Sequence, residues 1–351
     1  MAYRVLIAGL GSRAKGHLEG IRRTGGIEAV AGVDPDGIRR EQWQSAYGFE
    51  CSGNLEAMIE KYRPDVVSIC TGEKPRYSVA CAAMDLGVKS LVLEKPMAAS
   101  VSQARDLMSR ADKLGVRVVV SHQMRFADEF VAAKQAIERG DIGQPYFLRA
   151  SSYGQLMEQG PHMIDMLLYL LGDESGNGNP AEWVMGQVAD REEGLSTVHQ
   201  APAFTTGYIR FRGNVRATVE CGRSFAPSVE YVKGESIWLQ KRVQVLGTEG
   251  MVDSVVSHWC RLFNRDGAKT LAEGPHGWDG ATIALYGELV EVLRDGGEHR
   301  CNGRVSLAGF EIIHAIYESA VRGDKVTLPL EIGEEPLSIL MAPVRRQEQA
   351  G

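Results

Sequence analysis

The sequence predicts an α/β protein of two domains: an N-terminal doubly wound parallel sheet, then an α/β domain with a large, open, mainly antiparallel sheet. Up to residue 120, short apolar strand segments alternate with helical ones, which is typical of parallel strands covered on both faces. From residue 183 to 256, strand segments follow one another without intervening helices. A chain of 351 residues is also longer than one typical core requires.

The first domain is predicted to span residues 1–122. Short apolar runs predict strands at 4–8, 27–33, 66–70, 90–93 and 116–120. Apolar periodicity predicts helices at 14–24, 55–61, 77–86 and 101–114. Ser100 is a suitable N-cap for the last helix, and Gly115 is placed to end it.

The second domain is predicted to span residues 123–344, followed by a loose tail at 345–351. Its helices are expected at 128–139, 161–171, 281–294 and 307–322. Its strands are expected at 145–152, 183–188, 204–211, 215–221, 237–246 and 251–256. The edges of such an open sheet need cover, which favours a homo-oligomer.

Composition excludes several classes of function. The net charge of −6 disfavours nucleic acid as a partner, because phosphate backbones select basic surfaces. No apolar run approaches the roughly 20 residues that cross a bilayer, and no secretory leader is recognisable, so we expect a cytoplasmic protein without membrane contact. The six cysteines form no C-x-x-C pair, and His258 with Cys260 supplies too few ligands for a closed metal site. No metal is therefore expected.

A glycine-rich motif predicts a phosphate-binding loop. Gly9-Leu10-Gly11-Ser12-Arg13-Ala14 follows a predicted strand and opens a predicted helix, the context in which G-x-G-x-x-[GA] binds a dinucleotide. Gly9 permits the tight turn, Gly11 lets the backbone approach a pyrophosphate, and Ala14 allows close helix–strand packing. Ser12 and Arg13 begin the helix whose free N–H groups would face the phosphates. An ordinary strand-to-helix turn is the alternative.

Asp34 ends the second predicted strand and indicates which dinucleotide is bound. A carboxylate there accepts hydrogen bonds from the ribose hydroxyls of NAD and repels a 2′-phosphate. NAD is therefore the expected cofactor, although Arg39 and Arg40 just downstream leave NADP possible. A turn residue before Pro35 is the alternative for Asp34. Thr71, directly after the third predicted strand, is a further cofactor-binding candidate.

A charged tripeptide, Glu94-Lys95-Pro96, stands at the carboxyl end of the fourth predicted strand. Ligands of open α/β sheets bind outside that edge, so Glu94 and Lys95 are candidates to contact the cofactor. The same tripeptide occurs at Glu73-Lys74-Pro75, but there it is expected in a loose turn. Because the tripeptide at 94–96 directly follows an apolar strand, Lys95 is the predicted site residue and Lys74 is not.

With these motifs, the sequence resembles the glucose–fructose oxidoreductase/inositol dehydrogenase/rhizopine-catabolism (Gfo/Idh/MocA) family. The resemblance rests on the segments 9–14, 94–96, 140–143 and 160–165 together with Asp34, and it continues more weakly through 247–250 and 328–330. It implies a Rossmann domain followed by an α/β domain whose open sheet often forms a subunit interface, in a homodimer or homotetramer. It also implies NAD(P)-dependent oxidation or reduction of sugars, polyols or related alcohols.

The resemblance also implies roles for individual residues. The lysine of the Glu-Lys-Pro motif, here Lys95, is catalytic in the family, and the histidine that begins the apolar helix, here His162, is the usual acid/base. An aspartate often precedes that histidine by four residues, and here Glu158 takes its place. A histidine often found after the third strand is missing, and Tyr77 lies near that position. These departures weaken assignment to a familiar sugar dehydrogenase subgroup.

The chemistry of alcohol oxidation suits these side chains. Hydride leaves a carbinol carbon only if the hydroxyl proton also leaves, and an imidazole such as His162 can accept that proton near neutral pH. The Lys95 ammonium can stabilise the developing alkoxide, and Glu158 can orient the imidazole or bind a substrate hydroxyl. A histidine satisfied in the core is the alternative for His162. Further substrate candidates are Arg125, for which a structural salt bridge is the alternative, Tyr153, Asp165 and His122.

Three functions remain open from the sequence. The first is an NAD-dependent dehydrogenase or reductase of a sugar, polyol or related cyclic alcohol. The second is an NAD-dependent hydrolase or epimerase that oxidises its substrate only transiently. The third is a cofactor-binding sensor without catalysis, which would not need both Lys95 and His162.

Overall fold

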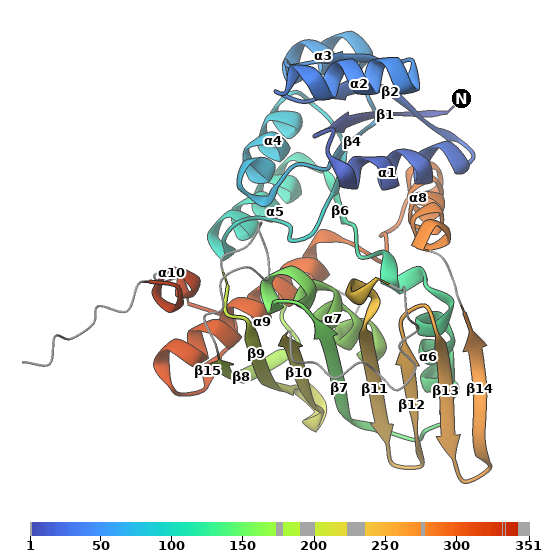
Figure 1. The fold of residues 1–351 in the computed structure, drawn as a ribbon, viewed down its shortest axis with the longest axis vertical. Helices are drawn as coiled ribbons and strands as arrows, with labels where there is room; N and C mark the ends of the chain where they lie inside the picture. Colours follow the sequence, from blue (N-terminus) through green and yellow to red (C-terminus); the bar gives the residue numbers. More distant parts are fainter. Residues whose placement is uncertain are drawn as a thin grey trace, which may run out of the picture.

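The computed structural model describes residues 2–172, 178–189, 201–222, 236–274, 278–331, 333 and 335–342. It has two sheets, with the six-stranded sheet at the top of Figure 1 and the nine-stranded sheet below it. Within the described ranges, no helix is long and apolar enough to span a membrane. The tail predicted at 345–351 lies outside these ranges.

The first sheet has the doubly wound order β3-β2-β1-β4-β5-β6, and every strand pair in it is parallel. Its strands are β1 (Tyr3–Ala8), β2 (Ile27–Val33), β3 (Glu50–Ser52), β4 (Val66–Ile69), β5 (Ser90–Leu93) and β6 (Arg117–Val120). The helices between them are α1 (Ser12–Arg23), α2 (Gly37–Tyr47), α3 (Leu55–Tyr62), α4 (Glu73–Asp85) and α5 (Val101–Leu114). This confirms the predicted Rossmann architecture.

The two faces of this sheet are covered by different helices. Alternate residues of β1 enter different cores: Val5 and Ile7 pack with α1, whereas Leu6 and Ala8 pack on the side of α4 and α5. The α1 face is completed by α8 (Trp278–Asp295), a helix from far along the chain that contacts α1 (Figure 1). The sequence analysis assigned this helix to the second domain, predicted at 123–344. Its place along the chain did not reveal that it covers the first sheet.

The second sheet has nine strands in the order β14-β13-β12-β11-β7-β10-β9-β8-β15. Its strands are β7 (Pro145–Tyr153), β8 (Ala181–Ala189), β9 (Phe204–Phe211), β10 (Arg216–Gly222), β11 (Lys241–Gly247), β12 (Gly250–Val255), β13 (Trp259–Asn264), β14 (Gly267–Glu273) and β15 (Val326–Thr327). Only the β7–β10 pair among the described ladders of this sheet is parallel. The large, mainly antiparallel sheet is therefore confirmed.

Helices cover one face of this second sheet. They are α6 (Asp128–Glu138), α7 (Leu156–Leu171) and α9 (Gly303–Arg322), and a short α10 (Pro336–Leu340) packs on α9. Along β9, buried and half-buried residues alternate strictly, so the other face of the sheet has no described helix over it. Helix α9 also contacts α5 and β6, so it ties the two sheets together (Figure 1).

Several helices begin earlier than the sequence predicts, α7 by five residues and α4 and α9 by four each. Helix α4 starts at Glu73, so Lys74 and Pro75 lie in its first turn and not in a loose turn, because proline is tolerated where the N–H groups have no intrahelical partner. Helix α7 starts at Leu156 and not at Pro161. The Tyr317 hydroxyl of α9 accepts a hydrogen bond from the Met157 N–H at 3.0 Å, a long-range cap that local sequence does not indicate.

Six helices and strands of the described ranges were not predicted: α2, β3, β13, β14, β15 and α10. Elements α2 and β3 connect β2 to α3, and β13 and β14 extend the large sheet at one edge. Strand β14 is exposed along most of its length, so it carries almost no apolar alternation.

Candidate active site

A cleft of about 640 Å³ runs along the carboxyl ends of β1, β2, β4 and β5, where the parallel topology brings their following loops together. Residues predicted to bind cofactor line it: Gly9, Gly11, Ser12, Arg13, Asp34, Thr71, Glu94 and Lys95. Ala14 is fully buried behind the loop, where a small side chain allows α1 to approach the sheet. Glu158 from α7 also lines the cleft, which therefore reaches from one sheet to the helices of the other.

The glycine loop fits a dinucleotide. Gly9 has φ +90°, and a Cβ there would lie 2.7 Å from the backbone nitrogen of Thr71, so only glycine permits this turn. Gly11 is the N-cap of α1 and supplies no side-chain cap, which leaves the first-turn N–H groups facing the cleft. A Cβ on Gly11 would have no protein atom within 4 Å, so the space beside it is open to a ligand. Phosphate oxygens are the acceptors that such a helix start binds.

Asp34 is held rigidly beside this loop. Its carboxylate is buried and accepts hydrogen bonds from the backbone N–H groups of Leu10 at 2.7 Å and Asp36 at 2.9 Å. The Arg39 guanidinium lies 3.7 Å from the same carboxylate. A fixed acceptor at this point suits ribose hydroxyls, whereas the nearby Arg39 cation would tolerate a 2′-phosphate.

Glu94 is the centre of a buried polar network. One of its oxygens accepts hydrogen bonds from Arg13 at 2.6 Å and from His17 at 3.0 Å. His17 in turn lies 2.7 Å from the Tyr286 hydroxyl of α8. Burial raises the pKa of Glu94, but the His17 hydrogen bond and the Arg13 charge outweigh it, so the pKa lies well below its usual range. Glu94 is therefore a fixed anion that anchors the backbone next to Lys95.

Lys95 extends from the cofactor cleft towards the second domain. Its Nζ donates a hydrogen bond to the backbone carbonyl of Glu158 in α7 at 2.9 Å. Burial lowers the pKa of Lys95, and the Glu94 charge partly restores it. The structure thus brings the predicted lysine to the helix that carries the predicted histidine.

His162 lies in the second turn of α7, four residues after Glu158, and is buried. Residues four apart share a helix face, so Glu158 and His162 face the same side. Burial and the positive charges of Lys95 and Lys241 hold the pKa of His162 well below its usual range. The imidazole is therefore neutral at neutral pH, the state that a proton acceptor needs.

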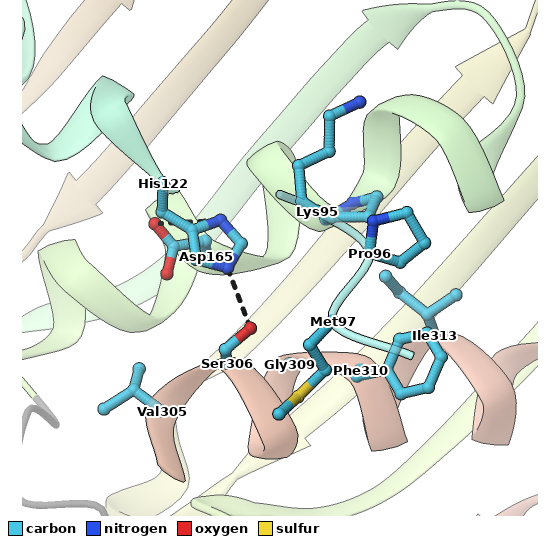
Figure 2. Close-up of a pocket in the computed structure, with 11 residues that line it drawn as sticks. Lys95, Pro96, Met97, His122, Asp165, Val305, Ser306, Gly309, Phe310 and Ile313 are labelled. Carbon is cyan, nitrogen blue, oxygen red and sulfur yellow. Dashed lines mark hydrogen bonds and ion pairs between the residues drawn. The ribbon is translucent and has the colours of Figure 1, made fainter. Parts of the chain in front are cut away.

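Arg125 and Asp165 form a structural ion pair. Arg125 is fully buried, and its guanidinium donates to Asp165 from Nε, at 3.0 and 2.9 Å to the two carboxylate oxygens, and from Nη2 at 2.8 Å. Its Nη1 donates to the Arg300 carbonyl. This geometry favours the salt-bridge interpretation of Arg125 over substrate binding. Figure 2 shows Asp165 beside His122, whose Nε2 lies 3.0 Å from the Ser306 hydroxyl.

A small cavity of about 10 Å³ separates this ion pair from α9. Lys95 lines one wall of the cavity, but its ammonium points away from Met97 and Phe310 at the apolar end (Figure 2). The space is about that of one water molecule, so it is too small for a substrate. Tyr153, the remaining substrate candidate, ends β7 with its ring 5.3 Å from that of Trp238.

Two buried residues near the site were missed from the sequence. His17 lies in α1 and reaches Glu94, as described above. Lys241 begins β11, is only 2% exposed, and shares the covered face of the strand with Val243 and Val245. A lysine in register with inward apolar residues was the available signal, because lysine is almost never buried without a reason. Among the described residues, no cluster of three metal ligands occurs.

The fold and site define a class of protein. A doubly wound parallel sheet, a glycine loop at a helix start and a fixed carboxylate after β2 together define a dinucleotide-binding domain. The lysine and histidine beside it are the groups that an oxidoreductase of alcohols uses.

Comparison with known proteins then identifies the family. Residues 3–122 match the model described as "Oxidoreductase family, NAD-binding Rossmann fold", and residues 146–253 match "GFO/IDH/MocA C-terminal domain". The chain belongs to the Gfo/Idh/MocA oxidoreductase family and is an NAD-dependent oxidoreductase.

Relatives of known activity and solved structures agree with this assignment. D-apiose dehydrogenase of Paraburkholderia graminis is 25% identical over 95% of this chain and 92% of its own length. The scyllo-inositol 2-dehydrogenase (NAD+) of Bacillus subtilis is 26% identical over 71% of this chain and 72% of its own. An oxidoreductase from Agrobacterium radiobacter, solved with NAD+, L-tartaric acid and magnesium, superposes with a TM-score of 0.81 at 18% identity over 93% of this chain and 98% of its own. At that identity it supports the fold alone.

Proposed function

We propose that this protein uses NAD to oxidise a hydroxyl-bearing carbon of a sugar, polyol or related cyclic alcohol, or to reduce the corresponding carbonyl. The observation that supports the proposal is the hydrogen bond from Lys95 Nζ to the backbone carbonyl of Glu158, because it joins the lysine that lines the cofactor cleft to the helix that carries His162. The named relatives act on apiose and scyllo-inositol, which are compounds of this class.

The residues supply proton transfer and charge stabilisation. When NAD is bound in the cleft lined by the glycine loop and Asp34, it would supply the hydride acceptor for oxidation and the hydride donor for reduction. His162, kept neutral by burial and by the neighbouring lysines, accepts the hydroxyl proton of the substrate and returns it in the reverse direction. Lys95 donates a hydrogen bond to the same oxygen and stabilises the alkoxide charge as it develops.

Glu158 acts as a positioning residue in this proposal. Its Oε2 is buried and has no hydrogen-bond partner in the described part of the chain, so it is free to accept from a substrate hydroxyl or from His162. Its side chain is one methylene longer than the aspartate typical of the family, and its place in the first turn of α7 gives it access to the cleft.

A panel of sugars and polyols, monitored at the nicotinamide absorbance, tests the proposal. Stoichiometric NADH formation with at least one neutral or acidic sugar or polyol is expected. Product formation without net NADH would instead support the hydrolase or epimerase with transient oxidation. NAD binding without turnover of any compound would support the sensor.

We propose that the open face of the large sheet packs against a second copy of the chain, in a homodimer or homotetramer. Met185 and Phe263 are exposed apolar residues that alternate with buried ones on β8 and β13, and an extensive uncovered sheet is a typical interface. Light scattering of the purified protein tests this, and a monomeric mass would contradict it.

Cytoplasmic location stays a prediction that fractionation of cells would test.

A further inference from the structure

Lys241 lies directly beneath the helix that carries His162. Strand pairing aligns Lys241 of β11 with Ser152 of β7 and Ser152 with Cys221 of β10, so the three side chains form one row across the sheet. All three are buried on the face that α7 covers. The lysine is therefore a buried residue under α7 and not a surface residue.

The Lys241 ammonium is incompletely satisfied. Among the described residues, its only hydrogen bond goes to the backbone carbonyl of Trp238, whereas an ammonium has three N–H donors. Burial and the Lys95 charge lower its pKa to about 7, while Cys221 and Glu158 act in the opposite direction. A buried cation with unused donors is costly unless an anion joins it.

The carboxylates near this site are already paired, with one exception. Glu94 is held by Arg13 and His17, and Asp165 is held by Arg125. Within the described ranges, this leaves Glu158 as the one carboxylate that offsets the charges of both Lys95 and Lys241. The site therefore has a surplus of positive charge, which a second negative group would balance.

We propose that Lys241 binds a carboxylate group of the substrate, so that the substrate is a sugar acid or another polyhydroxy carboxylate. The inference rests on the proposed function and narrows it. Lys95 contacts the oxygen that reacts, and Lys241, buried under α7, holds the anionic group that orients the carbon chain. A neutral polyol could accept a hydrogen bond from Lys241 but could not neutralise its charge.

Matched pairs of ligands that differ in one carboxylate test the inference. Calorimetry on the protein saturated with NADH compares D-glucuronate with D-glucose, D-galacturonate with D-galactose, and D-gluconate with D-glucitol. At least one acid is expected to bind tenfold or more tightly than its neutral partner. If no acid of the panel binds more tightly than its partner, the inference is wrong.

Variants connect the preference to this lysine. Lys241→Met and Lys241→Gln are expected to remove the preference for the acid while NADH affinity stays within about twofold. Lys269→Met, at an exposed position on β14, is the control and should leave the preference intact. A preference that survives both Lys241 variants would overturn the assignment even if the acids bind well.

Proton uptake gives a readout that a purely structural lysine would not change. A bound carboxylate raises the pKa of Lys241, so binding at pH 7.5 should take up protons, measured as a dependence of the binding enthalpy on the buffer. The groups that act on this lysine are Lys95, Glu158 and Cys221. The wild-type protein should show uptake with the acid and none with its neutral partner. Equal uptake for both would contradict the inference without any variant.

The outcomes separate this inference from the proposed function. Net NADH formation with neutral sugars, together with no acid preference, would remove the role of Lys241 and leave the dehydrogenase intact. Tight, Lys241-dependent binding of an acid without NADH formation from any compound would remove the dehydrogenase and keep the anion site.

Discussion

The two sides of the active site are built in different ways. On the cofactor side, functional residues lie within two residues of the end of a parallel strand: Gly9 after β1, Asp34 after β2, Thr71 after β4 and Glu94 after β5. On the substrate side, His162 comes from the second turn of a helix and Lys241 from the start of a distant strand.

This difference has a physical basis. Parallel strands end at one edge, so chain order alone brings the cofactor residues together. The substrate residues meet only because α7 packs across β7, β10 and β11. The first side is thus determined by topology, and the second by packing. Lys95 belongs to both, because it follows β5 and contacts α7.

The largest effect is expected where the cofactor side meets the substrate side, from replacing Lys95 or His162. Lys95→Met and His162→Ala are each expected to lower kcat/KM by about 10²–10⁴-fold, the usual contribution of a positioned acid or base. NAD affinity should stay within a few-fold for His162→Ala, since His162 does not line the cofactor cleft. Steady-state kinetics and NAD titration measure both quantities. Lys74→Met, in the same tripeptide but exposed in α4, is the matched control, and a comparable loss there would refute the assignment to Lys95.

The buried ion pair tests whether the substrate side depends on packing. Arg125→Met leaves Asp165 as an uncompensated buried carboxylate, a change that typically costs about 3–5 kcal/mol of folding free energy. Chemical denaturation should show this loss. The double variant Arg125→Met with Asp165→Leu should recover part of it. If Arg125→Met keeps full stability and loses only substrate affinity, Arg125 is a substrate residue after all.

Gly9 and Gly11, in the same loop, should respond differently to replacement by alanine. Gly11→Ala places its Cβ in open space, so unfolding without NAD should be unchanged while NAD affinity falls about tenfold or more. Gly9→Ala should lower the melting temperature of the protein even without NAD, because its Cβ would meet the Thr71 backbone. Thermal melts with and without NAD separate the two effects. Equal behaviour of both variants would contradict the loop assignment.

A smaller effect is expected from replacing Asp34, which is predicted to determine the preference for NAD over NADP. Asp34→Ser should reduce the preference for NAD over NADP by about tenfold, because the repulsion of a 2′-phosphate is removed and Arg39 remains nearby. Fluorescence titration with NADH and NADPH measures the ratio. Tighter binding of NADPH than NADH by the wild-type protein would overturn the role given to Asp34.

The pH profile is the mildest test. Protonation of His162 disables the base, and its pKa lies well below 6.5, so kcat/KM for oxidation of a neutral sugar should be flat near neutrality and fall only in more acidic solution. Burial also lowers the pKa of Lys95, so the alkaline fall should begin below 10.5. The acid limb should vanish in His162→Ala and the alkaline limb in Lys95→Met. An acid limb at or above pH 6.5 would contradict the buried, neutral imidazole.

Local patterns predicted much of the fold. The strands at 27–33, 90–93 and 204–211 and the helix at 101–114 have the bounds that the structure shows, because alternation, caps and glycine stops act within a few residues. The early starts of α4 and α7 were missed because prolines normally mark helix beginnings. In α7 the preceding turn is stabilised by Tyr317, about 160 residues away.

The sequence by itself determined the dinucleotide loop, Asp34 and the lysine after β5, because strand ends and glycine turns are local and parallel topology places them at one edge. Only the tertiary structure decided that α8 covers the first sheet, that Arg125 is committed to Asp165, and that Lys241 is buried under α7. Those outcomes depend on burial between segments distant along the chain, and side-chain burial is a property of packing that no local pattern specifies.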